Sequence, residues 1–159
     1  MGDESRRTGT SRLSVEVVAA PGEARRLARW LESAAPRAAR GLVTVAVVSD
    51  ARLRALNRQY RGNDASTDVL SFPAEEPGVL GDIVIARGVA ARQAREARHP
   101  AGTELRVLAL HGLLHLLGHD HESDQGQMAR LERRLRRAAG LREGLIERAV
   151  QPRRTRGPR

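Results

Sequence analysis

The chain has 159 residues and a formal net charge of +9, with 40% hydrophobic and 30% charged residues. This length and composition predict one soluble globular domain, and no apolar run reaches the ~18 residues that a membrane span needs. The sequence contains no cysteine, which excludes disulfide scaffolds, thiolate metal sites, iron–sulfur clusters and cysteine nucleophiles. These features fit the reducing cytoplasm, which is the compartment we expect.

The positive charge is concentrated towards the C-terminus. All 28 basic residues are arginines, and residues 130–159 contain 11 of them with 3 acidic residues, a net charge of +8. Residues 1–129 have a net charge of only +1. Such a one-sided field favours a polyanionic partner, most often nucleic acid, and a solubilising tail is the alternative. With one Trp, one Tyr and one Phe, contacts to RNA should use arginine and phosphate rather than stacked bases.

The first part of the chain predicts alternating strands and helices. In order, we expect a flexible N-terminus, a strand, a helix, a buried strand and a second helix, at residues 1–11, 13–17, 21–35, 42–48 and 49–60. Pro21 is a suitable start for the first helix and Pro36 ends it at the latest. Ser49 is a good N-cap for the second helix.

The second part predicts two strands close in sequence, followed by helices. We expect a loop, a strand, a turn, a strand and a helix at residues 61–67, 69–72, 75–78, 80–86 and 87–99. Thr103 can cap a helix that runs to Leu117, and Gly118 then occupies the left-handed position after the helix end. A last helix is expected over residues 123–139, with Met128, Leu131 and Leu135 facing inward.

These elements predict an α+β fold with a small mixed sheet of about four strands and about five helices. One domain is expected over residues 12–140. A basic C-terminal extension over residues 141–159 should follow it, with a disordered end.

Four of the five histidines lie between residues 111 and 121. His111 and His115 are four residues apart on a predicted helix, so both side chains emerge on one face and can bind one metal ion. Gly118 can turn left-handed without strain and bring His121 back towards the same point. Three neutral imidazoles with an open fourth position are typical of a catalytic zinc site, although imidazole ligands also accept Ni, Cu or Fe.

The spacing H-x-x-x-H-x-x-G-x-x-H is that of the metzincin proteases, with one difference. Zinc proteases carry a glutamate beside the first histidine as general base, whereas this chain has Gly112. A peptidase would therefore need another base. A closed structural zinc site is disfavoured because cysteine is absent and the nearest fourth ligands, His119 and Asp120, are neighbours in sequence.

The histidine segment, read with three others, resembles the YbeY-type metal-dependent endoribonucleases, the rRNA maturation factors. The carrying motif runs from His111 to His121, and the agreeing segments are residues 56–61, 67–73 and 80–85. The resemblance covers about residues 13–137. The chain departs from the family's common residues at Asn63, Ser66 and His119.

The resemblance implies that His111, His115 and His121 bind one catalytic zinc ion, and that Arg61 lines the cleft and contacts substrate phosphate. Asp120 lies between two imidazoles and is expected to orient a ligand or take a proton, with helix capping as the alternative. The implied activity is single-strand-specific RNA cleavage in 16S rRNA 3′-end maturation and ribosome quality control. The implied partners are single-stranded RNA, the small ribosomal subunit, ribosomal proteins and an Era-like GTPase.

Two other functions stay open besides this one. The first is a zinc peptidase with another base, and the second is a non-catalytic ribosome-assembly factor whose zinc holds the fold. Among the remaining polar residues, His119 is expected to be a surface residue or proton shuttle and His99 a solvent-exposed loop residue. Asp68 and Ser71 are expected to shape the sheet and the cleft floor.

Overall fold

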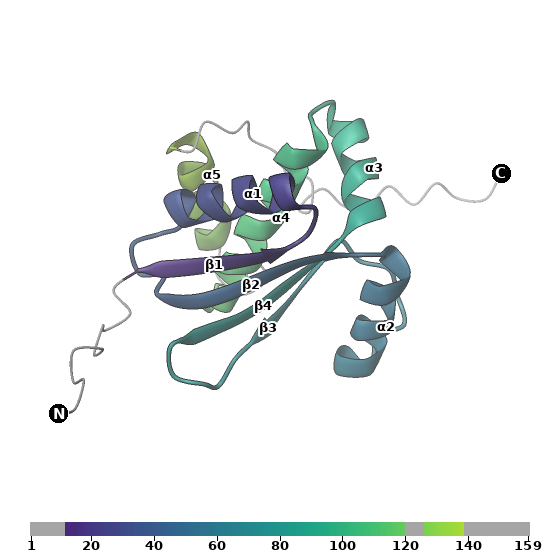
Figure 1. The fold of residues 1–159 in the computed structure, drawn as a ribbon, viewed down its shortest axis with the longest axis horizontal. Coiled ribbons are helices and arrows are strands. Elements are labelled where there is room, and N and C mark those ends of the chain that lie inside the picture. Colours follow the sequence, from purple (N-terminus) through teal and green to yellow (C-terminus); the bar gives the residue numbers. More distant parts are fainter. Residues whose placement is uncertain (1–11, 120–125, 139–159) are drawn as a thin grey trace.

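The computed structural model describes residues 12–119 and 126–138 (Figure 1). Within these ranges four strands and five helices follow one another in the order β1 (Leu13–Val18), α1 (Pro21–Ala34), β2 (Gly41–Val48), α2 (Asp50–Arg61), β3 (Val69–Pro73), β4 (Val79–Ala86), α3 (Arg87–Ala97), α4 (Ala101–Leu116) and α5 (Gln127–Ala138). This confirms the predicted α+β class. The predicted flexible N-terminus and basic C-terminal extension lie outside the described residues.

The strands form one mixed sheet in the order β1-β2-β4-β3. β1, β2 and β4 are parallel, and β3 runs antiparallel to β4 at one edge. The central strand β2 has the sequence GLVTVAVV, an apolar run typical of a parallel strand covered on both faces. The edge strand β1 alternates between more and less buried residues, as expected where one face packs against a helix.

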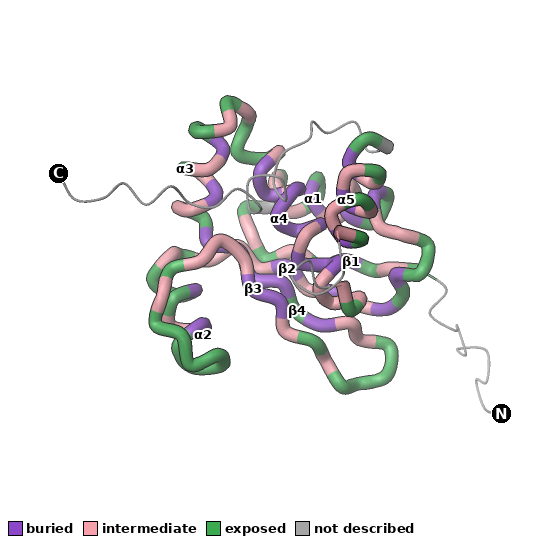
Figure 2. Tube along the Cα trace, turned by 180° about the vertical axis from the view of Figure 1, so that it is seen from behind, coloured by how far each residue is buried: buried purple, intermediate pink, exposed green. Residues whose placement is uncertain are grey.

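Helices cover both faces of the sheet. Figure 1 shows α1, α4 and α5 grouped on one side and α2 at the other. Leu27 and Leu31 of α1 belong to the main core beneath β1, whereas Leu53 of α2 packs with Leu70 and Val84 on the opposite face. The buried segments in Figure 2 lie mostly in the inner strands and in α4. α4 is apolar around most of its circumference, which is the pattern of a central helix.

The helix ends agree with the sequence in two places and differ in a third. Ser49 Oγ accepts a hydrogen bond from the Arg52 N–H at 3.1 Å, and Gly118 adopts the left-handed conformation after α4 with φ +92°. The predicted cap at Thr103 is wrong because α4 begins at Ala101. The Thr103 N–H already donates to the Pro100 carbonyl at 3.0 Å, which places Thr103 inside the first turn.

None of the helices in residues 12–119 and 126–138 combines the length and the apolar character that crossing a membrane requires.

The last helix begins at Gln127 rather than at residue 123, and residues 120–125 lie outside the described part of the chain. Met128 is fully buried, and Leu131 and Leu135 pack against it, as the sequence predicts.

Candidate active site

Two histidines of α4 face each other at the surface of the helix layer. The Nε2 atoms of His111 and His115 are 3.0 Å apart, and the rings meet edge to face with centroids 4.7 Å apart. Two nitrogens that bind one zinc ion at about 2.0–2.1 Å must lie less than about 4.2 Å apart. The pair therefore fits two ligands of a single ion without any movement of the helix.

The remaining predicted site residues are the third metal ligand and the acid–base residue. His121 and Asp120 both lie outside the described residues. Among the residues that are described, no group of three His, Cys, Asp or Glu side chains is arranged to hold a metal ion. The structure thus brings together two of the three predicted ligands.

A cleft of about 340 Å³ opens beside this pair. Its other walls come from the end of α2, the following loop and β3. The residues that line it are Arg61, Thr67, Asp68, Val69, Ser71, Pro73, His111 and His115. The cleft thus gathers Arg61 and the two histidines from segments far apart in the sequence.

Arg61 is the last residue of α2, which Gly62 ends with a left-handed φ of +66°. Its Nη2 donates a hydrogen bond to the Ser71 carbonyl at 2.9 Å, so the guanidinium is held against β3. A guanidinium carries five N–H groups. The remaining ones have no partner in the described part of the chain and are available to an anion in the cleft.

Asp68 and Ser71 shape the cleft, as the sequence analysis expects. The Asp68 carboxylate accepts hydrogen bonds from the Val69 N–H at 2.8 Å and from Gln93 Nε2 at 3.2 Å, which fixes the start of β3. Ser71 is buried, and its hydroxyl donates to the Gly112 carbonyl at 3.0 Å. This bond fastens α4 to β3 between the two histidines and the sheet.

The loop between α2 and β3 is anchored to α2 by two side-chain hydrogen bonds. Asn57 Nδ2 donates to the Ala65 carbonyl at 3.0 Å, and Arg54 Nε donates to Asp64 Oδ1 at 2.9 Å. The Arg54 guanidinium holds the pKa of the Asp64 carboxyl below its ordinary value. These contacts give the cleft a defined rim at Thr67.

Glu132 is a candidate site residue that the sequence analysis missed. It lies on α5, its side chain is 1% exposed, and its Oε2 is 3.3 Å from His111 Nδ1. A carboxylate at this nitrogen accepts the Nδ1 hydrogen and leaves Nε2 free to bind a metal ion. The signal in the sequence is a charged residue next to the inward-facing Leu131 and four residues after Met128.

The prediction that His99 is a solvent-exposed loop residue is wrong. Its side chain is only 17% exposed, and its Nε2 contacts Oε2 of the fully buried Glu104. The cause is the early start of α4 after Pro100, which folds the preceding residue back onto the first turn of the helix. This pair is separate from the cleft residues.

Comparisons with known proteins identify the family of this chain. A family model described as endoribonuclease YbeY matches residues 14–140. The endoribonuclease YbeY of Solibacter usitatus is 51% identical over 125 residues, which cover 79% of this chain and 80% of that protein. The Koribacter versatilis protein of the same name is 51% identical over 113 residues, covering 71% and 74%.

A solved structure has the same fold. The solution structure of a Thermotoga maritima protein matches with a TM-score of 0.58 and 28% identity, over 92% of this chain and 99% of that one. The resemblance expected from the histidine segment is thereby confirmed. This chain belongs to the endoribonuclease YbeY family.

Proposed function

We propose that this protein is a metal-dependent endoribonuclease that cleaves single-stranded RNA in the cleft between α4 and β3. The observation that supports this most directly is the pair of Nε2 atoms, 3.0 Å apart, in one cleft with Arg61. The names of the similar proteins supply the reaction class. An RNA phosphodiester supplies the negative charge that such a cleft accepts.

His111, His115 and His121 would hold the ion, with zinc as the metal that best suits three neutral imidazoles. When bound, a divalent cation supplies a Lewis acid beside the scissile phosphate. The donor chemistry of the two described histidines fits this metal, because both Nε2 atoms face the same point.

Arg61 would bind the phosphate that is cleaved. Its anchored guanidinium presents N–H groups that match two phosphate oxygens and stabilise the charge that develops during cleavage. The bond from Nη2 to the Ser71 carbonyl holds the group in place before the substrate arrives. Glu132 would orient the His111 ring from the opposite side of the imidazole.

Within this proposal, the family resemblance gives the physiological substrate as the 3′ end of 16S rRNA and the setting as ribosome quality control in the cytoplasm. The small ribosomal subunit is the partner that this role requires. The net positive charge of the chain is compatible with such a partner.

The proposal is tested by an RNA cleavage assay on the purified protein after measurement of its metal content. We expect a single-stranded oligoribonucleotide to be cut, a chelator to stop the reaction, and zinc to restore it. A duplex of the same sequence serves as the control and should remain intact. Intact single-stranded RNA in the presence of metal-replete protein would overturn the proposed activity.

A second expected outcome concerns Glu132. Replacing it with glutamine removes the charge at His111 Nδ1 and should weaken zinc binding by about 10–100-fold. Titration of the metal-free protein against a competing zinc chelator measures this change. Glu96→Gln is the matched control, because Glu96 is an exposed glutamate on α3. Unchanged zinc affinity in the Glu132 variant would show that this carboxylate only packs the α4–α5 interface.

A further inference from the structure

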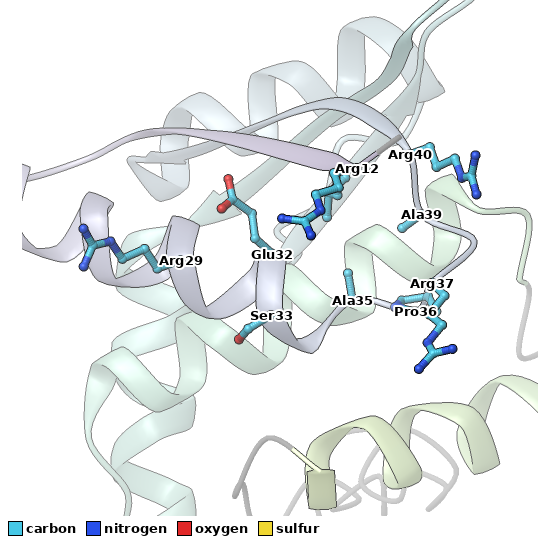
Figure 3. Close-up of a pocket in the computed structure, with 10 residues that line it drawn as sticks. Arg12, Arg29, Glu32, Ser33, Ala35, Pro36, Arg37, Ala39 and Arg40 are labelled. Atoms are coloured by element: carbon cyan, nitrogen blue, oxygen red, sulfur yellow. The ribbon is translucent and has the colours of Figure 1, made fainter. Parts of the chain in front are cut away.

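A second hollow, which we call the β1-edge hollow, lies at the opposite edge of the sheet (Figure 3). Its volume is about 600 Å³. Its walls are the start of β1, the last turns of α1 and the segment that leads into β2. One acidic residue, Glu32, lines it together with four arginines, which are Arg12, Arg29, Arg37 and Arg40.

The charge of the β1-edge hollow is largely uncompensated. All four arginines are exposed, and none of them forms an ion pair within residues 12–119 and 126–138. The Glu32 carboxylate binds the backbone instead of an arginine. Its Oε1 accepts a hydrogen bond from the Val15 N–H at 3.0 Å, at the free edge of β1. The hollow is thus a concave, cationic surface, which attracts anions.

The arrangement of the arginines indicates the shape of the anion. Figure 3 shows their side chains fanned out around the hollow rather than aimed at one point. This spread matches a chain of phosphates better than a single small anion. No aromatic residue is among those that line the hollow, so contacts would go to the backbone and not to stacked bases.

α5 carries further basic residues beside the two helices that border the β1-edge hollow and the cleft. This helix contacts both α1 and α4. A further hollow of about 440 Å³ on it is lined by Arg130, Arg133, Arg134 and Arg137. The β1 and β3 edges of the sheet are three strand spacings apart, or about 14 Å. A single strand of several nucleotides can cross that distance.

We infer that the β1-edge hollow binds the phosphodiester backbone of a single-stranded RNA whose scissile segment lies in the cleft. The inference rests on the proposed function and adds a second contact to it, remote from the reacting phosphate. Its consequence is a dependence on RNA length, because only a strand that extends past the cleft reaches the arginines.

The test uses the double variant Arg37→Gln, Arg40→Gln, whose two positions lie between α1 and β2, outside any helix or strand. The full-length chain carries His115→Ala throughout so that the RNA stays intact. Binding of labelled oligouridylates of about 4 and about 16 nucleotides, a range typical of single-strand sites, is measured by fluorescence anisotropy at several salt concentrations. The matched control is Arg52→Gln, Arg95→Gln, which removes the same charge at exposed positions of α2 and α3.

We expect the Arg37→Gln, Arg40→Gln variant to bind the longer RNA about 25-fold more weakly than the parent at 0.1 M salt. The slope of log affinity against log salt concentration should fall by about 1.4 in magnitude, because two phosphate contacts are lost and each contributes about 0.7. The affinity of this variant for the shorter RNA should equal that of the parent. The control variant should bind both RNAs as tightly as the parent does. Equal losses in both double variants, or no loss in either, would overturn the inference. Loss of binding to poly-glutamate with RNA binding retained would overturn it in favour of an acidic protein partner. Because binding is measured apart from cleavage, the two failures can be told apart. Failure of the proposed activity appears as intact RNA in the cleavage assay, and failure of this inference appears as unchanged RNA affinity in the binding assay.

Discussion

Replacement of His115 by alanine should lower the rate of single-stranded RNA cleavage by at least about 10³-fold. The reason is that a catalytic metal ion contributes several kcal/mol of charge stabilisation to its reaction, and each 1.4 kcal/mol corresponds to a factor of ten in rate. His115 supplies one of the two nitrogens, 3.0 Å apart, that face the same point in the cleft. The initial rate and the zinc content of the variant should therefore fall together.

The control for this result is the stability of the variant. His115 is half-buried, so its truncation should leave the fold intact, and the thermal transition in the presence of chelator should match that of the parent in chelator. A variant that cuts RNA at the parent rate would show that the pair on α4 is not the reaction centre. A large loss of stability on chelation, with RNA bound but not cut, would favour the non-catalytic assembly factor, since structural metal energy is folding energy.

The histidine pair could be predicted from the sequence because it depends on helix geometry alone. Residues four apart on a helix share a face wherever the helix packs, so the spacing of His111 and His115 was sufficient. The left-handed residue after α4 is equally local, since Gly118 is the residue type that adopts that conformation without strain. The start of α4 was not predictable in this way, because Thr103 and the Ala101–Gly102 pair both allow a helix to begin.

The position of Arg61 depends on contacts between distant segments. The end of α2 reaches the cleft because β3 lies at the sheet edge beside β4. No local sequence pattern predicts this strand order. The family resemblance therefore predicts Arg61 as a cleft residue, whereas its local sequence does not. The contact of Glu132 with His111 depends on how α5 packs against α4. The only local sign of it in the sequence is a charged residue among the apolar residues on the inward face of α5.

Gly112 gives the geometric reason why a protease-type glutamate is absent from this site. A Cβ atom at this position would lie 2.7 Å from Cγ2 of Ile83 and 3.1 Å from the Ser71 hydroxyl oxygen. The position is therefore packed against β4 at Ile83 and against Ser71 of β3, one of the residues that line the cleft. A glutamate side chain has no room here unless α4 moves away from the sheet.

We therefore expect Gly112→Glu to destabilise the protein severely and to gain no peptidase activity. Burial of an unpaired carboxylate costs several kcal/mol, a large part of a typical stability of about 5–15 kcal/mol. Gly112→Ala should cost about 1–3 kcal/mol through overpacking, or roughly 2–12 °C in melting temperature at about 2–4 °C per kcal/mol.

Gly102 is the matched control because it lies in the first turn of the same helix, and a Cβ atom added there would have no neighbouring atom within 4 Å. Alanine at this position should stabilise α4 by up to about 1 kcal/mol, and glutamate should be tolerated because acidic residues suit a helix N-terminus. Thermal unfolding of the four variants checks the contrast between the two glycines. A Gly112→Glu protein that melts like the parent and hydrolyses peptides would mean that residue 112 reaches the cleft and that the reaction class proposed for this site is wrong.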